Sequence, residues 1–365
     1  MTAQNKDRVV AQEPLKHYIK EIFIRMGMPQ DDAEIEASVL IWANLRGVDS
    51  HGVQLIPWYV EAVEIGHMKL KPGIVIEKET PATLLIDADH AFGPVVTSYA
   101  MRLVMEKAKT VGIGWAFIRK TNHQGAIGYY PLMAAKEDMA GIMWSCGQTT
   151  TAPYGARFPG IANNPIAIAV PAKRHRPLIL DMATSIAAVS KLHLAKDKGV
   201  QIPDTWALDK EGNVTTDPWK ASILQPVGGP KGSGLSIMLE CLTSIIVDFP
   251  KLEPVLSGRE EPFGLEGMIG NPDKIRRHIG NSTVAAIDIG MFTDVNVYKE
   301  HIDKMIDGLK SLPRADGVDE IFVPGEPEDR IFDERSLKGI PIPHKTASNL
   351  RDVGNKLDIP LPSGL

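Results

Sequence analysis

Short apolar runs alternate with helix-length segments through the middle of the chain, without the glycine pattern of a dinucleotide-binding turn. Runs typical of strands occur at 82–89, 112–120, 140–147, 164–171, 176–183 and 282–292. Segments with helical spacing lie between them, at 93–111, 184–199 and 235–249. No Gly-x-Gly-x-x-Gly follows a strand-like run, since GIGW at 112–115 lacks the third glycine. The pattern predicts an α/β protein and argues against a Rossmann domain.

Helices are predicted at both ends of the chain. Apolar spacing indicates helices over 13–28, 29–46 and 56–65, with the aspartates at 31 and 32 as caps of the second. Near the other end we expect a helix over 294–311 and one short helix after it, while a loop is predicted over 250–280. These segments suggest that the chain has three parts: N-terminal helices (1–80), a sheet domain (81–292), and C-terminal helices (293–365) that pack back on the first part.

Composition excludes several classes of protein. The 365 residues are 44% hydrophobic and 23% charged, which is typical of a packed globular chain. A net charge of −5 without a basic stripe argues against nucleic acid as a partner. No apolar run is long enough to span a membrane or to resemble a signal peptide, so we expect a cytoplasmic protein. Cys146 and Cys241 are far apart, so neither a disulfide framework nor a thiolate metal site is predicted.

The segment DSHG places three proton-handling side chains in a row between two glycines. Asp49, Ser50 and His51 follow the end of a predicted helix at Gly47. A histidine with a free ring nitrogen exchanges protons near neutral pH or polarises a carbonyl. The alternative is a turn in which Asp49 and Ser50 satisfy backbone groups.

The segment NHQGAIGYY places a second histidine between a predicted strand and a predicted helix. His123 stands where α/β proteins often carry reactive groups. The positive end of a helix that follows directly would help to keep the ring neutral, ready to accept the proton of an alcohol. The alternative is a surface residue that caps the helix.

Two further segments suggest a ligand with an anionic group. In GGPKGSG, the glycines from Gly228 to Gly234 allow close approach of backbone amides at a helix start, and Lys231 adds positive charge. The pattern is not that of a P-loop, and a flexible loop with a solvated lysine is the alternative. In LDMATS, Asp181 ends an apolar strand, where it can bind a ribose hydroxyl or satisfy helix amides, and Thr184 or Ser185 can cap the next helix.

Six motifs in this order resemble the malate/L-lactate dehydrogenase family. They are LRGVDSHGV, NHQGAIGYY, PYGARFPGIANNPIAIAVP, LDMATS, IPDTWALDKEGNVTTDP and GGPKGSGL, within residues 45–235. PGEPEDR at 324–330 also fits the family. The resemblance implies a non-Rossmann NAD(P)-binding fold with a mostly antiparallel central sheet, flanked by helices from both termini. It also implies a homodimer that transfers a hydride between a nicotinamide and a carbon beside a carboxylate.

The resemblance assigns roles to individual residues. It implies His123 as the proton acceptor, with Ser50 and His51 on the substrate side. The residues that it implies for cofactor binding are Gly147, Asn164, Pro165, Asp181, Met182, Ala183, Lys231 and Gly232. No metal is implied.

Two positions depart from the family pattern. Leu55 stands where the family has an arginine that binds the substrate carboxylate, and leucine cannot replace a guanidinium fork. Gln54 offers a hydrogen bond but no charge, so Arg46, Arg157 or Lys231 becomes a candidate for the missing cation. Gln148 replaces an acid found in one member of the family, which would leave His123 with a neutral neighbour.

Three functions follow from these residues. The first is an NAD(P)-dependent oxidoreductase of a small 2-hydroxy acid, its 2-oxo acid or a related ketone. The second is a reductase of a cyclic imine, in which His51 or His123 acts as an acid. The third is a cofactor-binding protein with little catalysis. NAD and NADP are not distinguished, because Arg174 and Arg176 fit either a 2′-phosphate or a basic surface turn.

Overall fold

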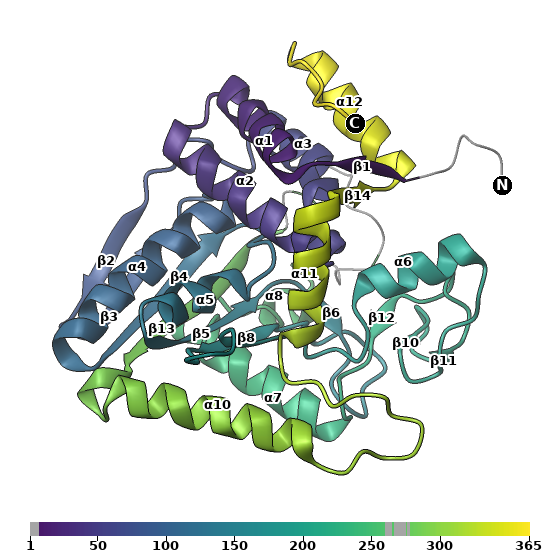
Figure 1. Ribbon diagram of the computed structural model, residues 1–365. Helices are drawn as coiled ribbons and strands as arrows, with labels where there is room; N and C mark the ends of the chain where they lie inside the picture. The colour runs from purple at the N-terminus through teal and green to yellow at the C-terminus, as the bar shows by residue number, and fades with distance from the viewer. Residues whose placement is uncertain (1–6, 260–264, 266–274, 276–277) are drawn as a thin grey trace.

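A seven-stranded sheet forms the centre of the computed structural model, which describes residues 7–259, 265, 275 and 278–365 (Figure 1). In spatial order its strands are β2 (Val75–Glu79), β3 (Thr83–Asp87), β4 (Ile113–Thr121), β13 (Gly280–Asp288), β5 (Met139–Cys146), β8 (Ile166–Val170) and β9 (Leu178–Met182). Within the described ranges β3 and β4 form its one parallel pair, and the other neighbours are antiparallel. The predicted mostly antiparallel α/β fold is therefore confirmed.

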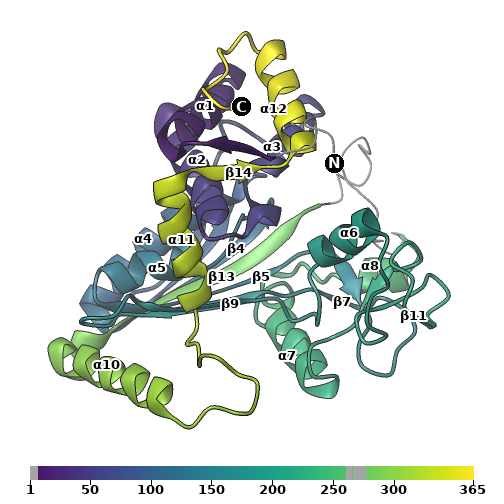
Figure 2. The ribbon, with the colours of Figure 1, turned by 45° about the vertical axis from the view of Figure 1, so that its right-hand side comes forward.

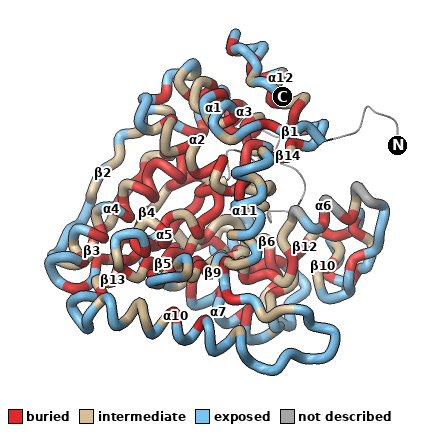
Figure 3. Tube along the Cα trace, viewed as in Figure 1, coloured by how far each residue is buried: buried red, intermediate tan, exposed pale blue. Residues whose placement is uncertain are grey.

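Helices cover both faces of this sheet (Figure 2). On one face lie α4 (Gly93–Val111) and α5 (Tyr129–Lys136), and on the other lie α7 (Pro230–Cys241) and α10 (Val295–Ser311). The central strand β13 is buried along most of its length, which explains its continuous run of small residues (Figure 3). A Cβ at Gly114 would lie 2.0 Å from the Val104 carbonyl oxygen, so glycine permits the close approach of α4 to β4.

Both ends of the chain build one helical module above the sheet (Figures 1 and 2). Its elements are α1 (Gln12–Met26), α2 (Gln30–Leu45), α3 (Ile56–Glu64), α11 (Glu326–Lys338), α12 (His344–Lys356) and the strands β1 (Arg8–Val10) and β14 (Ile340–Ile342), which pair antiparallel. Buried side chains from both ends form one apolar cluster, and the Tyr18 hydroxyl donates to the Leu350 carbonyl at 2.7 Å. The flanking helices from both termini are thus confirmed.

A second, smaller sheet lies beside the central one and was not predicted as a sheet. Its order is β11 (Val214–Thr215), β10 (Ala207–Leu208), β12 (Ile223–Leu224), β6 (Thr149–Thr151) and β7 (Ile161–Ala162), and α6 (Val189–Lys198) packs near it. Only the β10–β11 hairpin was recognisable, because its strands flank a polar turn at 209–212. Strands of two residues carry too little periodicity to be read from the sequence.

Four local predictions are wrong. Pro29, without a side-chain cap, precedes α2, and Asp31 and Asp32 lie in its first turn. Ala188 precedes α6, so Thr184 and Ser185 do not cap it. Two helices, α11 and α12, follow α10 instead of one. The loop predicted over 250–280 contains the short helix α8 (Glu253–Leu256), and most of its remainder lies outside the described residues. Among the described residues no helix is long and apolar enough to cross a membrane.

Candidate active site

The DSHG segment forms a tight turn that connects α2 to α3. Two short 3-10 helices, η2 (Asp49–His51) and η3 (Val53–Leu55), make this turn. Asn44 closes it, since its Nδ2 donates to Asp49 at 2.6 Å and its Oδ1 accepts from the Val53 amide at 2.9 Å. A Cβ at Gly52 would lie 2.2 Å from the Asn44 Oδ1, so only glycine fits there.

Asp49 has a structural role in this turn. Arg335 of α11 donates from Nη1 to its Oδ1 at 2.7 Å and from Nη2 to its Oδ2 at 3.0 Å. The same guanidinium also donates to the Asn44 carbonyl. A bidentate arginine fixes both the position and the orientation of a carboxylate. Asp49 therefore orients the turn, and Ser50 and His51 are the members of DSHG that remain for chemistry.

The two predicted histidines come together in the structure. The rings of His51 and His123 are stacked, with centroids 5.4 Å apart and an interplanar angle of 24°. Ser50 Oγ lies 2.8 Å from His51 Nδ1 and holds that ring in place. Although imidazoles gather here, no group of three or more His, Cys, Asp or Glu in the described part of the chain could hold a metal ion.

Tyr59 and Gly125 both engage the same nitrogen of His123. The Tyr59 hydroxyl lies 2.8 Å from Nδ1, and the Gly125 amide donates to Nδ1 at 3.2 Å. Nε2 is thus the nitrogen left for a substrate. A hydroxyl donates or accepts, so Tyr59 supports either neutral tautomer, whereas the Gly125 amide favours the one with its proton on Nε2.

Burial keeps both rings neutral. It lowers the pKa of His51 to about 4. It also lowers the pKa of His123 well below the ordinary value, and the charges that His51 and His278 would carry lower it further. The predicted cause was different, because α5 begins only at Tyr129 and its positive end does not directly follow His123. The expected neutral ring is present, but desolvation explains it.

Asp181 at the end of β9 connects the strand to the His123 loop. Its Oδ2 accepts a hydrogen bond from the Gly128 amide at 2.7 Å. Part of the side chain is accessible to solvent. The protein around the carboxylate nevertheless removes much of its hydration, which raises its pKa to about 6. Met182 and Ala183 continue from it and are partly exposed.

Asn164 connects this edge of the sheet to α7. Its side-chain amide donates to the Ser236 carbonyl, and its backbone N–H donates to Thr184 Oγ1 at 3.1 Å. Pro165 follows it directly before β8, and its carbonyl accepts a hydrogen bond from the Ser145 amide.

The glycine loop forms the start of α7, as predicted. Gly228 and Gly229 have positive φ angles of 60° and 59°, and the exposed Lys231 lies in the first helical turn. A Cβ at Gly232 would lie 1.9 Å from the Val227 carbonyl oxygen, so the loop folds back tightly on the helix. Side chains at Gly147 or Gly228 would instead enter open space. Helix amides, a lysine, an acid and open space fit a nucleotide with a pyrophosphate and a ribose.

A sequence model of the malate/L-lactate dehydrogenase family matches residues 10–351 of this chain. The chain belongs to the malate/L-lactate dehydrogenase family. A malate dehydrogenase of Pyrococcus horikoshii is 35% identical over 360 residues, which cover 96% of each chain. The L-sulfolactate dehydrogenase of Methanocaldococcus jannaschii is 35% identical over 353 residues, which cover 96% of this chain and 98% of that one. An Escherichia coli K12 ureidoglycolate dehydrogenase (NAD(+)) is 28% identical over 333 residues, covering 91% and 92%.

Solved structures agree with this assignment. The sulfolactate dehydrogenase from Methanocaldococcus jannaschii superposes with a TM-score of 0.85 and covers 97% of this chain and 98% of that one. A malate dehydrogenase from Entamoeba histolytica, 25% identical, reaches 0.89 and covers 98% and 99%. The protein is therefore an oxidoreductase of the malate/L-lactate dehydrogenase type, and it uses a nicotinamide cofactor.

Two of the three cations predicted as substitutes for an arginine at position 55 are engaged elsewhere in this dehydrogenase, and the third, Lys231, lies exposed in the first turn of α7. Arg46 is buried, pairs with Asp329 and donates to the Gly325 carbonyl at 3.1 Å. Arg157 is exposed and donates to Asn213 at 2.6 Å. Leu55 packs against the apolar cluster of the helical module, and Gln54 is exposed.

Sequence reasoning missed two aromatic residues and a third histidine. Trp58 and Tyr59 on α3 contact His123, with ring centroids 5.4 Å and 6.1 Å away. His278, just before β13, lies 6.1 Å from His123 and 5.0 Å from Trp58. The available signal was the one used for His123, a histidine at the boundary of a strongly predicted strand. Gln148 also reaches this segment, because its Nε2 donates to the Ile279 carbonyl at 3.3 Å.

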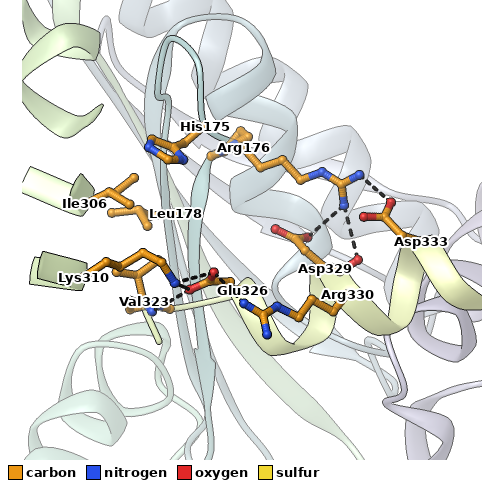
Figure 4. A pocket seen from close by; sticks show the side chains of 12 residues that line it. His175, Arg176, Leu178, Ile306, Lys310, Val323, Glu326, Asp329, Arg330 and Asp333 are labelled. Carbon is orange, nitrogen blue, oxygen red and sulfur yellow. Dashed lines mark hydrogen bonds and ion pairs between the residues drawn. The ribbon is translucent and has the colours of Figure 1, made fainter. Parts of the chain in front are cut away.

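A separate pocket of about 230 Å³ lies between the β8–β9 turn, α10 and α11 (Figure 4). Its charged lining residues face one another, as when Arg176 pairs with Asp333 at 2.6 Å. Arg174 nearby pairs with Asp307 at 2.5 Å. Both arginines of the basic turn are thus paired with acids on neighbouring helices.

Proposed function

We propose that this dehydrogenase interconverts a small 2-hydroxy acid and its 2-oxo acid, with His123 as the residue that exchanges the proton. The stacked pair of His51 and His123, held by Tyr59 and Ser50, is the observation that carries the proposal. Relatives whose names include malate, sulfolactate and ureidoglycolate support an acidic substrate of this size.

The two histidines have different roles at the reacting oxygen: His123 exchanges its proton, and His51 orients it. When bound, the nicotinamide accepts or supplies the hydride. In oxidation, His123 Nε2 takes the hydroxyl proton in the tautomer whose Nδ1–H donates to the Tyr59 hydroxyl, and in that tautomer Nδ1 no longer accepts the hydrogen bond from the Gly125 amide. In reduction the doubly protonated ring returns that proton to the oxygen. His51 and Ser50 orient the same oxygen by hydrogen bonds. A neutral ring at pH 7 suits the role of base.

A titration and one variant test this assignment. NADH and NADPH are added to the purified protein, and quenching of tryptophan fluorescence is followed before 2-oxo acids are screened. Replacing His123 by Gln is expected to lower kcat about 100- to 10,000-fold, because general acid–base catalysis contributes that much. Cofactor affinity should stay within a factor of two. Wild-type turnover in H123Q would reject His123 as the proton-exchanging residue, and no binding of either cofactor would reject the function.

We propose that the preferred cofactor is NAD. A 2′-phosphate needs an available cation, and Arg174 and Arg176 already pair with Asp307 and Asp333. The same titration is expected to give at least a tenfold lower Kd for NADH than for NADPH. Equal affinities would contradict this preference.

Reduction of a cyclic imine is the second candidate. Leu55 stands where the family pattern has an arginine that binds the substrate carboxylate, so the substrate does not need a carboxylate at that position. An imine must be protonated before the hydride arrives, and the lowered pKa of both histidines disfavours this at neutral pH. Turnover of an imine should therefore rise as the pH falls, with an optimum below that for a 2-oxo acid.

We also propose a homodimer that uses one face of α7 and the segment after it. Six apolar side chains of α7 and the segment after it are exposed: Leu235, Ile237, Met238, Leu242, Ile245 and Ile246. Apolar residues at helical spacing on a surface mark a protein–protein contact. Sedimentation should show a dimer, and Met238→Lys should shift it towards monomer, whereas Lys304→Glu on α10 should not. A monomeric wild-type protein would exclude this assembly.

A further inference from the structure

The carboxylate of a 2-oxo acid is bonded directly to the reacting carbon, so whatever binds it must lie beside His51 and His123. A carboxylate is bound by a cation, by N–H donors or by both. Leu55 provides neither, and Arg46 and Arg157 are held by other partners. The third histidine of the site, His278, has its ring 6.1 Å from that of His123 and carries N–H donor capacity.

His278 reaches the site from a different direction than the other two histidines. It lies on the segment that enters β13, far from α3 in the sequence, yet its ring contacts that of Trp58 on α3. Trp58 presents its ring edge-on to both histidines, at 75° to His123 and 78° to His278. The indole therefore sets the spacing between the proton-exchanging ring and the ring of His278.

A buried lysine holds the backbone next to His278. Lys251 is 6% exposed and donates to the Ile279 carbonyl at 2.6 Å, one residue after the histidine. Gln148 donates to the same oxygen. Burial is the main cause of the lowered pKa of His278, the charge that His67 would carry lowers it further, and the Lys251 charge makes a smaller contribution in the same direction. The buried Glu240 also interacts with Lys251. Burial raises the pKa of Glu240, and the Lys251 charge lowers it by a smaller amount.

We propose that His278 binds the substrate carboxylate in this chain, with Lys251 supplying positive potential. An imidazole N–H donates to the carboxylate, and the lysine acts through a short path of low dielectric. The residue that selects the substrate thus enters from the β13 side of the site and not from η3. This inference rests on the proposed function, because it requires a substrate with a carboxylate beside the reacting carbon.

The test compares a 2-oxo acid with its methyl ester, which has the same skeleton without the charge. His278→Ala should raise KM for the acid about 10- to 100-fold, as expected for loss of a hydrogen bond to a charged group. KM for the ester should change less than about threefold, and kcat for both should stay within about threefold. His278→Gln, which retains an N–H donor, should recover part of the affinity for the acid.

Two further variants separate binding from folding. Lys251→Met should raise KM for the acid by a smaller factor than His278→Ala, in the same direction, while leaving the ester unaffected. His301→Ala changes an exposed histidine on α10 and should have no effect. NADH titration confirms that each variant is folded.

The outcomes distinguish the two hypotheses. If His278→Ala affects the acid and the ester equally, or leaves both unchanged, the inference is wrong while the proposed function stands. If the wild-type protein reduces the ester as well as it reduces the acid, the carboxylate has no dedicated partner and the inference is also wrong. If the wild-type protein neither binds NADH nor reduces any 2-oxo acid, the proposed function fails, and the inference fails with it.

Discussion

The two sides of the active site are built in opposite ways. The turn that carries Ser50 and His51 is clamped by side chains from other elements, because Asn44 fills its interior and Arg335 binds Asp49 from α11. The loop at the start of α7 is held by close backbone packing at Gly232 and leaves open space beside Gly228. Groups that must act on one atom are fixed, whereas a loop that receives a large ligand keeps its backbone accessible.

The largest effect is expected where the glycine loop is tightest. Gly232→Ala would place a Cβ 1.9 Å from the Val227 carbonyl oxygen, so the loop must move. Overpacking of this kind costs about 3 kcal/mol. We expect a lower melting temperature and weaker binding of NADH.

Gly234→Ala is the matched control in the same helix, since nothing lies within 4 Å of its added Cβ. It should stabilise the protein by up to about 1 kcal/mol, because alanine is the better helix former. Equal effects of the two substitutions would show that the loop does not depend on the close approach at Gly232.

An intermediate effect is expected from releasing the clamped turn. Arg335→Met removes both hydrogen bonds to Asp49, and bonds to charged groups are worth about 1.5–3 kcal/mol. We expect kcat to fall about tenfold, since 1.4 kcal/mol corresponds to that factor, while the Kd of NADH is unchanged. Lys338→Met, on the exposed side of the same helix, should be neutral. A loss of NADH binding without loss of kcat would reverse the assigned roles of the two sides.

The smallest effect concerns pH and Asp181. Its pKa is raised from 3.8 to about 6, so the folded state holds the proton more tightly than the unfolded state does. Wild-type stability should therefore decline as the pH rises from 4 to 6. If the carboxylate binds a ribose hydroxyl, NADH affinity should rise over the same interval. Asp181→Asn should remove both trends and leave the protein more stable at pH 7 but weaker in NADH binding. Trends that persist in D181N would assign them to another group.

The long elements could be predicted from the sequence because each carries its own pattern. The strands β4, β5, β8, β9 and β13 and the helices α1 to α4 agree with the predicted ranges. The caps of α2 and α6 were wrong because aspartate, serine and threonine also bind other partners, as Ser185 does at the Ala187 carbonyl. His51, His123, Asp181 and the glycine loop were predicted as site residues from local motifs, and their roles stay predictions.

The sequence by itself determined which chemical groups this dehydrogenase has, its α/β class and its family. Only the tertiary structure decided which groups meet. Arg46 became part of an ion pair with Asp329, Asp49 became a structural acid, and His278 joined His123 across more than 150 positions of sequence. Periodicity and motifs report interactions between near neighbours in sequence, whereas partners of a side chain in a folded core are set by packing between distant segments.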